Sequence, residues 1–145
     1  PMTLHLIKLC VGCDTIADLE EWIEETRLAY RRMGRAYEQT HTTRMFPKRI
    51  GENPDGASLY WVIKSRIVCR QRLLEVRPFK DAEGIGRCHL VLEPVVRPVR
   101  PRPMSPFQGW RYLAEADAPP DLSDLGAEPE MPEALRRELA GLGLL

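Results

Sequence analysis

Cysteine and long apolar runs are scarce in this chain of 145 residues. Its four cysteines are too few for the disulfide scaffold of a small secreted protein, so we expect reduced thiols. No apolar run approaches the roughly 20 residues that a membrane-spanning helix needs. The apolar segment 3–11 carries His5 and Lys8 and leads into an acidic segment instead of a cleavage site, which argues against a signal peptide. We therefore expect a cytoplasmic protein without a membrane partner.

Net charge is also missing, because 21 Lys and Arg residues balance 21 Asp and Glu residues. The balance exists only in total: residues 1–25 carry a net charge of −5, residues 26–112 carry +11 and residues 113–145 carry −6. Of the basic residues, 17 are Arg and four are Lys. Arg presents a planar fork of donors that suits phosphate, carboxylate and stacked bases. GC-rich codons explain the preference for Arg equally well, but they do not explain the segregation, which indicates an anionic partner for the middle of the chain.

The length fits one domain, or one domain and a tail, and 43% hydrophobic residues are enough for a core. The C-terminal part is acidic and holds Pro119, Pro120 and Pro129, a composition typical of a tail or linker. We expect a single domain over residues 1–113. Residues 114–145 are expected to form an acidic, proline-containing tail with a short helix at Glu133–Leu142.

The clearest helical signal follows a turn at 12–14. Thr15 is a suitable N-cap, and Asp18 stands three residues later, as in a capping box. Acidic side chains fill the early turns and basic ones the late turns, which complements the helix dipole. The spacing predicts a helix to about Tyr37, with an apolar face formed by Ile16, Leu19, Ile23, Thr26, Tyr30, Met33 and Tyr37.

The remaining regular segments are predicted to be short strands because β-branched and aromatic residues alternate with polar ones. They cover Thr3–Val11, Ser58–Lys64, Ile67–Val76 and Arg87–Glu93, with a further strand in His41–Arg49 that ends at Pro47. The middle strands are too close together for helical crossovers, which argues against a doubly wound parallel sheet. We expect an α+β fold, with a small mixed, mostly antiparallel barrel and a flanking N-terminal helix.

Five prolines lie between positions 94 and 106. They argue against a helix or a central strand, because proline has no backbone N–H to donate. We expect an extended polyproline-type arm that carries Arg97, Arg100 and Arg102. The segment Phe107–Leu113 that follows is expected to be a short strand or turn. Its Trp110 and Arg111 either contact a nucleic acid or, for Trp110, pack into the core.

The blocks HTTRMFPKR, SLYWVIK, RQRLLEV and PFQGWRYL resemble an alphaproteobacterial family known only as domain of unknown function fourteen-eighty-nine. The likeness covers about residues 2–122. This family has no established activity, so the resemblance implies no catalytic residue.

A second resemblance concerns the order of elements around residues 41–76. A basic strand with the motif T-x-R, a turn, a strand ending in Lys and a strand of the type IVCRQRLLEV are similar to PUA-like domains, including the ASCH and EVE branches. These small mixed barrels bind RNA or modified bases, and a few ASCH members hydrolyse modified nucleosides. The matching positions are Thr43, Arg44, Lys64 and Arg70. The chain departs from the family in lacking a glycine-framed loop after the first strand.

The middle of the chain combines cations with aromatic side chains. Phosphates need cationic contacts and unpaired bases need aromatic faces, which Phe46, Tyr60 and Trp61 provide. Alternatively, the cations are a solvated sheet face that acidic residues neutralise. The expected anion-binding or nucleic-acid-binding residues are Arg44, Lys48, Arg49, Lys64, Arg66, Arg70, Arg72, Trp110 and Arg111.

Cys10 and Cys13 form a C-x-x-C motif just before a predicted helix N-terminus, where a thiolate is stabilised. This arrangement is compatible with a redox pair, with inert buried thiols, or with half of a zinc site. A zinc site needs further ligands, for which Cys69, Cys88, His5, His41 and His89 are candidates. There is no second C-x-x-C motif, and nothing else in the sequence indicates a cofactor.

Weak catalytic candidates are Lys64, Thr43 and Glu75, which would act together in an ASCH-like amidohydrolase, and His41, beside Thr42 and Thr43. We expect non-catalytic binding of RNA or of a nucleotide-containing ligand by the basic sheet face. One alternative is hydrolysis of a modified nucleoside. Another is a protein-interaction module that docks through the acidic tail.

Overall fold

The computed structural model describes residues 3–125 and positions 137 and 141. The helix expected at Glu133–Leu142 therefore falls outside the described residues, apart from those two positions. None of the described helices is long and apolar enough to cross a membrane. The elements in chain order are β1 (Leu4–Leu9), α1 (Ile16–Arg32), β2 (Gln39–Thr43), β3 (Ser58–Ile63), β4 (Arg66–Lys80), β5 (Gly86–Leu92), β6 (Arg97–Pro103), β7 (Trp110–Ala114), the 3-10 helix η1 (Glu115–Asp117) and α2 (Leu122–Leu125).

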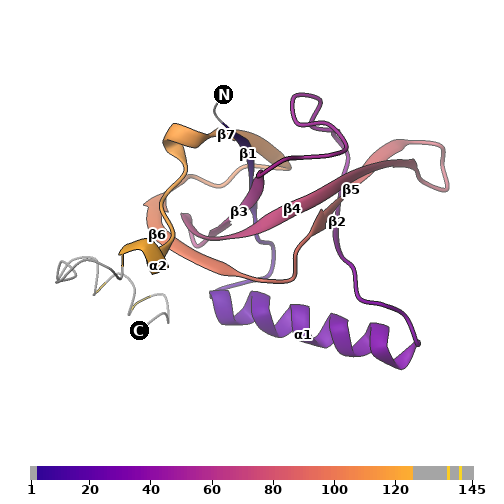
Figure 1. Ribbon diagram of the computed structural model, residues 1–145, viewed down its shortest axis with the longest axis horizontal. Helices are drawn as coiled ribbons and strands as arrows, with labels where there is room; N and C mark the ends of the chain where they lie inside the picture. Colours follow the sequence, from indigo (N-terminus) through magenta and orange to yellow (C-terminus); the bar gives the residue numbers. More distant parts are fainter. Residues whose placement is uncertain (1–2, 126–136, 138–140, 142–145) are drawn as a thin grey trace.

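The strands form one mixed sheet in the order β2-β5-β4-β3-β1-β7, with β6 paired to β4 outside this path (Figure 1). β1 and β3 run parallel, whereas the other neighbouring pairs are antiparallel. The α+β class and the mostly antiparallel sheet expected from the sequence are thus confirmed. Among the described residues, the end strands β2 and β7 are not paired with each other. Closure of the sheet into a barrel therefore stays a prediction.

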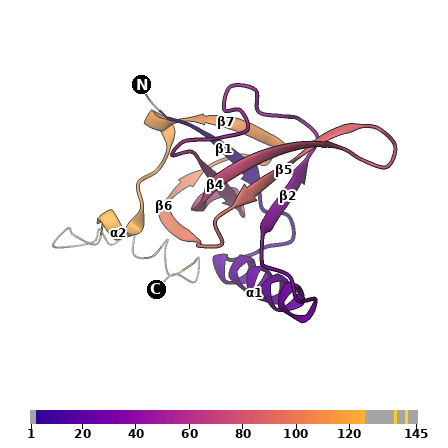
Figure 2. The ribbon, with the colours of Figure 1, turned by 45° about the vertical axis from the view of Figure 1, so that its right-hand side comes forward.

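Helix α1 covers one face of the sheet (Figures 1 and 2). Its Ile16, Leu19 and Ile23 are buried in a core that also contains Trp61 and Leu90. Thr15 caps the helix as expected: its hydroxyl accepts from the Asp18 N–H at 3.1 Å, and the Asp18 carboxylate accepts from the Thr15 N–H at 3.2 Å. A second core cluster includes Tyr60, Val62, Val99, Phe107 and Leu113, from β3, β6, β7 and the segment before β7.

The helix ends at Arg32, so the expected continuation to Tyr37 is wrong. Gly34 adopts φ +68, a conformation that costs glycine little and other residues more. The Gly34 N–H donates to the Arg31 carbonyl at 3.0 Å and the Arg35 N–H donates to the Tyr30 carbonyl at 2.9 Å. These two bonds form a Schellman motif, which satisfies the last carbonyls of the helix and turns the chain toward β2.

Two further expectations need correction. The strand expected to reach Pro47 ends at Thr43, and the chain then turns so that the Ile50 N–H donates to the Pro47 carbonyl at 2.9 Å. The polyproline-type arm is instead a strand, β6, which pairs with the first half of β4. Its prolines are tolerated because none of the described strands pairs along the other side of β6.

The edge of β6 that does not pair with β4 is covered by the segment that follows η1. The Arg100 N–H donates to the Pro120 carbonyl at 2.9 Å, and Val99 forms an isolated antiparallel bridge with Asp121. Pro119 is buried, and Ala118 packs against the second core cluster. The beginning of the acidic C-terminal region is thus packed against the sheet.

Candidate functional site

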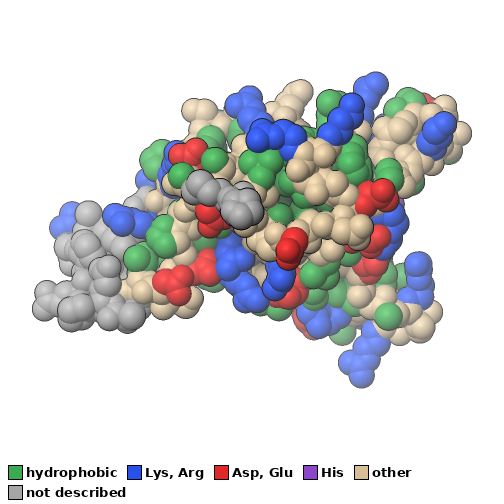
Figure 3. Space-filling view, turned by 45° about the horizontal axis from the view of Figure 1, so that its top comes forward, with side chains coloured by type: hydrophobic (Ala, Val, Ile, Leu, Met, Phe, Trp, Pro, Cys, Tyr) green, Lys and Arg blue, Asp and Glu red, His purple; other side chains and the backbone are tan. Residues whose placement is uncertain are grey.

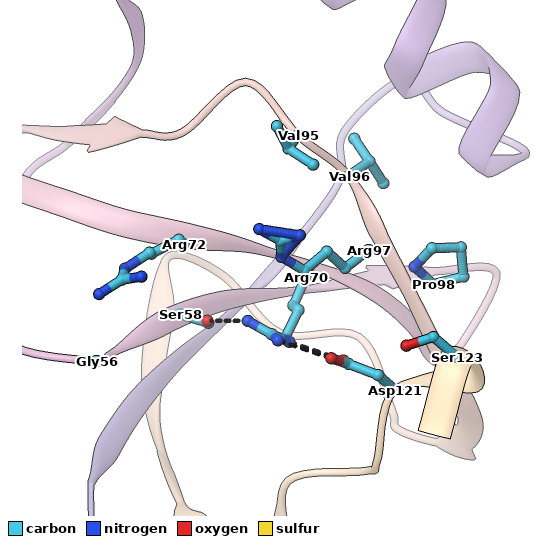
Figure 4. Close-up of a pocket in the computed structure, with 10 residues that line it drawn as sticks. All are labelled: Gly56, Ser58, Arg70, Arg72, Val95, Val96, Arg97, Pro98, Asp121 and Ser123. Carbon is cyan, nitrogen blue, oxygen red and sulfur yellow. Dashed lines mark hydrogen bonds and ion pairs between the residues drawn. The ribbon is translucent and has the colours of Figure 1, made fainter. Parts of the chain in front are cut away.

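A cleft of about 600 Å³ lies between β4, β6 and the segment that covers β6 (Figure 4). Its floor is polar and basic, and one wall is apolar. The lining residues are Gly56, Ser58, Arg70, Arg72, Val95, Val96, Arg97, Pro98, Asp121 and Ser123.

Arg70 is held at the centre of the cleft by three hydrogen bonds. Its Nε donates to Oδ1 of Asp121 at 2.8 Å, and its Nη2 donates to Oδ2 at 2.7 Å. Its Nη1 donates to the Ser58 hydroxyl at 2.8 Å. Figure 4 shows the Asp121 carboxylate directed at the guanidinium. This two-point geometry is the one with which Arg recognises a carboxylate or a phosphate.

Two more arginines reach the cleft. Arg97 is the register partner of Arg70 on the neighbouring strand, where like charges repel unless an anion offsets them. Arg97 donates from Nη2 to Oε1 of Glu93 at 2.9 Å. Arg72 is exposed, and Figure 4 shows its guanidinium turned away from Asp121. The cleft therefore concentrates positive charge that its acidic residues offset only in part.

The two partners at the centre are charged at neutral pH. The hydrogen bonds from Arg70 hold the pKa of Asp121 below its usual value, although partial burial opposes this shift. The same bonds raise the pKa of Arg70. Because each charge stabilises the other, Asp121 is a permanent internal anion of the cleft at physiological pH.

A second pocket of about 420 Å³ shares Ser58, Arg70 and Asp121 with the cleft and extends to His5 and Glu115. The Ser58 backbone N–H donates to Nδ1 of His5 at 2.9 Å. This nitrogen is therefore unprotonated, and Nε2 donates to the Glu115 carboxylate at 2.5 Å. His5 thus ties β1 to β3 and η1.

Of the predicted basic set, only Arg70 and Arg72 line the cleft. Lys64 and Arg66 lie at the β3–β4 turn, and Arg44, Lys48 and Arg49 follow β2. Arg111 lies on β7 and stacks its guanidinium 4.5 Å from the centre of the Phe107 ring. Figure 3 shows basic and acidic side chains intermixed on the face that it displays.

The predicted aromatic platform is dispersed. Trp61 is buried, and its Nε1 donates to Oε1 of Gln71 at 2.9 Å. Trp110 is half-buried, packs against the first core and donates from Nε1 to the Met45 carbonyl at 2.7 Å. Tyr60 lines the second pocket. Trp61 and Trp110 therefore serve packing, and the cleft itself has an aliphatic wall.

Ser58, Arg97 and Asp121 line the cleft, although no motif in the sequence marks them as site residues. The sequence predicts Arg97 on a polyproline-type arm and Asp121 in the acidic tail. The sequence signal for an ion pair such as Arg70–Asp121 is the charge segregation, since an acidic end and a basic middle of one chain attract each other. Only the pairing of β6 with β4 selects which charges meet.

The structure does not bring the catalytic candidates Lys64, Thr43 and Glu75 together. Thr43 pairs with Cys88, which pairs with Pro78 near the end of β4, whereas Lys64 precedes the start of β4 at Arg66. Among the described residues, no hydrogen bond or ion pair joins any two of these three side chains. The grouping therefore gains no support from the geometry.

Their individual contacts are structural. Thr43 Oγ1 lies 3.1 Å from Sγ of Cys88, and Glu75 accepts from Nη2 of Arg77 at 2.8 Å. The His41 ring lies 4.8 Å from the Trp61 ring, and burial lowers the pKa of His41 to about 4. His41 is therefore neutral at physiological pH.

Cys10 and Cys13 are close together, with a hydrogen bond from Sγ of Cys10 to Sγ of Cys13 at 2.8 Å. Of the other proposed zinc ligands, Cys88 contacts Thr43, His5 contacts Glu115 and His89 stacks on Phe79. Within the described part of the chain, no group of three or more His, Cys, Asp or Glu side chains is arranged to hold a metal ion. The expected zinc alternative thus gains no support from the geometry.

A family model described as "Protein of unknown function (DUF1489)" matches residues 6–145. No curated protein and no solved structure matches the chain. The likeness to PUA-like domains accordingly stays a prediction, whereas the family resemblance that the sequence blocks indicate is confirmed over nearly the full length. The chain belongs to the DUF1489 family of proteins of unknown function.

Proposed function

We propose that the cleft around Arg70 binds a phosphate-bearing ligand, RNA or a nucleotide-containing small molecule, without catalysing a reaction on it. The observation that carries the proposal is the bidentate pairing of Arg70 with a carboxylate in a cleft that Arg72 and Arg97 also line. A phosphate group presents oxygens with the same spacing and more charge, so it suits the same fork.

The size and walls of the cleft support a ligand with a planar apolar part. About 600 Å³ lies within the range of small-molecule sites. Val95, Val96 and Pro98 form an apolar wall opposite the arginines. A nucleobase lies against such a wall while its phosphate reaches Arg72 and Arg97.

The finer fold and location belong to this proposal as well. A PUA-like barrel is supported by the parallel pairing of β1 with β3 in a sheet whose other described strand pairs are antiparallel. Such barrels bind RNA or modified bases. This binding does not require a catalytic group formed by Lys64, Thr43 and Glu75. A cytoplasmic location is supported by the four unpaired cysteines.

The test is fluorescence anisotropy with labelled single-stranded RNA oligonucleotides, with unlabelled nucleotides as competitors and salt varied. Arg72→Ala and Arg97→Ala should each weaken binding roughly tenfold, the effect of losing about 1.4 kcal/mol of charged hydrogen bonding. Arg70→Ala is less suitable because it also removes the contact that holds Asp121. Affinity should fall steeply with salt if phosphates are bound.

Arg31→Ala is the matched control, because Arg31 is an exposed arginine on α1, away from the cleft. It should leave affinity within about twofold of the unmodified protein. The proposal fails if neither RNA nor any nucleotide binds at low salt. It also fails if Arg31→Ala weakens binding as much as Arg72→Ala, since binding would then follow net charge alone.

A further inference from the structure

Cys10 and Cys13 are placed for a direct bond between their sulfur atoms. Cys10 follows β1, and the Cys13 N–H donates to the Cys10 carbonyl at 3.4 Å across a turn. Gly12, the third residue of this turn, has φ +83, as a type II turn requires. A four-residue turn holds its end Cα atoms within about 7 Å, close to the 4.4–6.8 Å range of disulfides.

The two sulfur atoms are already close. Their separation of 2.8 Å exceeds the length of a disulfide bond by only about 0.8 Å. Neither cysteine forms a disulfide bond in the structure. Small rotations of the two side chains therefore suffice to form the bond, without a change in the sheet.

The pair is accessible from one side. Cys10 and Cys13 line a pocket of about 320 Å³ together with Trp22, His41 and Trp61. Cys10 is 7% exposed, whereas Cys13 is half-buried. Burial and the neighbouring Cys13 thiol raise the pKa of the Cys10 thiol. The two cysteines are thus unequal, and Cys13 is the one that a reagent reaches first.

We propose that Cys10 and Cys13 are a redox-active pair that forms a reversible disulfide by exchange with a small-molecule disulfide such as oxidised glutathione. The Cys13 thiolate, after losing its proton to solvent, attacks one sulfur of the oxidant and expels one thiolate, leaving a mixed disulfide on Cys13. Cys10 then loses its proton and attacks the Cys13 sulfur, which forms the Cys10–Cys13 bond and expels the second thiolate. The chain loses two electrons and two protons, and the oxidant becomes two thiols.

The remaining cysteines provide internal references. Cys69 is fully buried, and burial raises the pKa of its thiol. Cys88 is also fully buried and contacts Thr43 at the end of β2. Neither lines the pocket that exposes Cys13. Oxidation should therefore stop after one disulfide.

The test equilibrates the reduced full chain with mixtures of reduced and oxidised glutathione. The samples are then quenched in acid, alkylated and analysed by mass spectrometry with peptide mapping. We expect two of the four thiols to become protected from alkylation, both in the peptide that holds positions 10 and 13, and dithiothreitol to restore them. The Cys88→Ala variant should give the same titration.

Two variants test the order of attack. Cys10→Ser should accumulate one glutathione on Cys13, because the resolving thiol is missing, whereas Cys13→Ser should acquire almost none. Four free thiols at every glutathione ratio would overturn the proposal, as would a disulfide that includes Cys69. One equivalent of zinc in the purified protein, lost in Cys13→Ser, would also overturn it, because the thiols would then be metal ligands.

Discussion

The Asp121 carboxylate accepts two hydrogen bonds from the guanidinium of Arg70, although the residues are 51 positions apart in the sequence. The pair joins the acidic C-terminal region to the basic middle of the chain. It also places a negative group at the centre of the cleft in which we propose that phosphate binds. Asp121 therefore stabilises the fold and competes with an external anion for Arg70.

Asp121→Asn should increase affinity for RNA or nucleotide because it removes the competing charge while keeping the shape of the side chain. We expect roughly tenfold tighter binding, equivalent to about 1.4 kcal/mol, measured by the same anisotropy titration. Glu21→Gln is the control for net charge, since Glu21 is an exposed acid on α1 that does not line either pocket around Arg70. Equal gains from the two variants would mean that Asp121 does not compete for Arg70. This point substitution is cleaner than deletion of residues 114–145, which also removes Glu115 and the buried Pro119.

The contribution of Asp121 to stability should depend on pH. Arg70 lowers the pKa of this carboxyl in the folded state, so the contribution is complete above its unfolded pKa of about 3.9. It is lost as the pH falls through the folded-state pKa. Urea unfolding should show a constant difference between the unmodified protein and Asp121→Asn from pH 5 to 7, taken as approximate limits, and a shrinking difference below about pH 4. A difference that stays constant down to acid unfolding would contradict the assigned ion pair.

Gly34→Ala should destabilise the protein by about 1 kcal/mol, because alanine pays a steric cost in the left-handed conformation that the Schellman motif requires. No atom within 4 Å obstructs a Cβ at Gly34, so the cost is confined to the backbone. Gly86→Ala is the control, since Gly86 has open space and no positive φ. Thermal unfolding monitored by circular dichroism distinguishes the two, and an equal loss in both variants would contradict this account.

Gln71→Leu should destabilise the protein by about 2–4 kcal/mol, because Gln71 is fully buried at the centre of a polar network. Its Oε1 accepts from Trp61 Nε1 at 2.9 Å, and its Nε2 donates to Oε1 of Gln39 at 2.8 Å and to the Glu93 carbonyl at 3.0 Å. Leucine leaves these partners unsatisfied. Urea unfolding should show that the added substitution Gln39→Leu costs less in this background than in the unmodified protein. Additive losses would indicate that the two amides act independently.

The local elements could be predicted where their signals are complete within a few residues. The turn at 12–14, the Thr15 and Asp18 capping box, and the apolar stripe at Ile16, Leu19 and Ile23 are all local in sequence. Errors arose where a local preference met a longer-range partner. The prolines of β6 suggested an unpaired arm because their partners in β4 lie 27 to 37 residues earlier in the chain.

The candidate site was predictable only in part for the same reason. Arg70 and Arg72 were predictable because they stand two positions apart in a predicted strand, so both side chains point to the same face. Arg97 and Asp121 complete the cleft, but no spacing rule connects them to Arg70. The grouping of Lys64, Thr43 and Glu75 gains no support, because the three residues lie in the β3–β4 turn, β2 and β4 and share no hydrogen bond or ion pair.

Composition and periodicity by themselves determined an α+β chain with a capped N-terminal helix, a mostly antiparallel sheet and a basic middle between acidic ends. These properties depend on backbone preferences and on charge counts that neighbouring residues set. The tertiary structure alone decided that β6 joins β4, that Asp121 returns to Arg70, and that Arg70 and Arg72 are the predicted cations that line the cleft. The physical reason is that strands can pair whatever their separation in the sequence. This pairing brings side chains to hydrogen-bonding distance, and no local sequence pattern encodes such a contact.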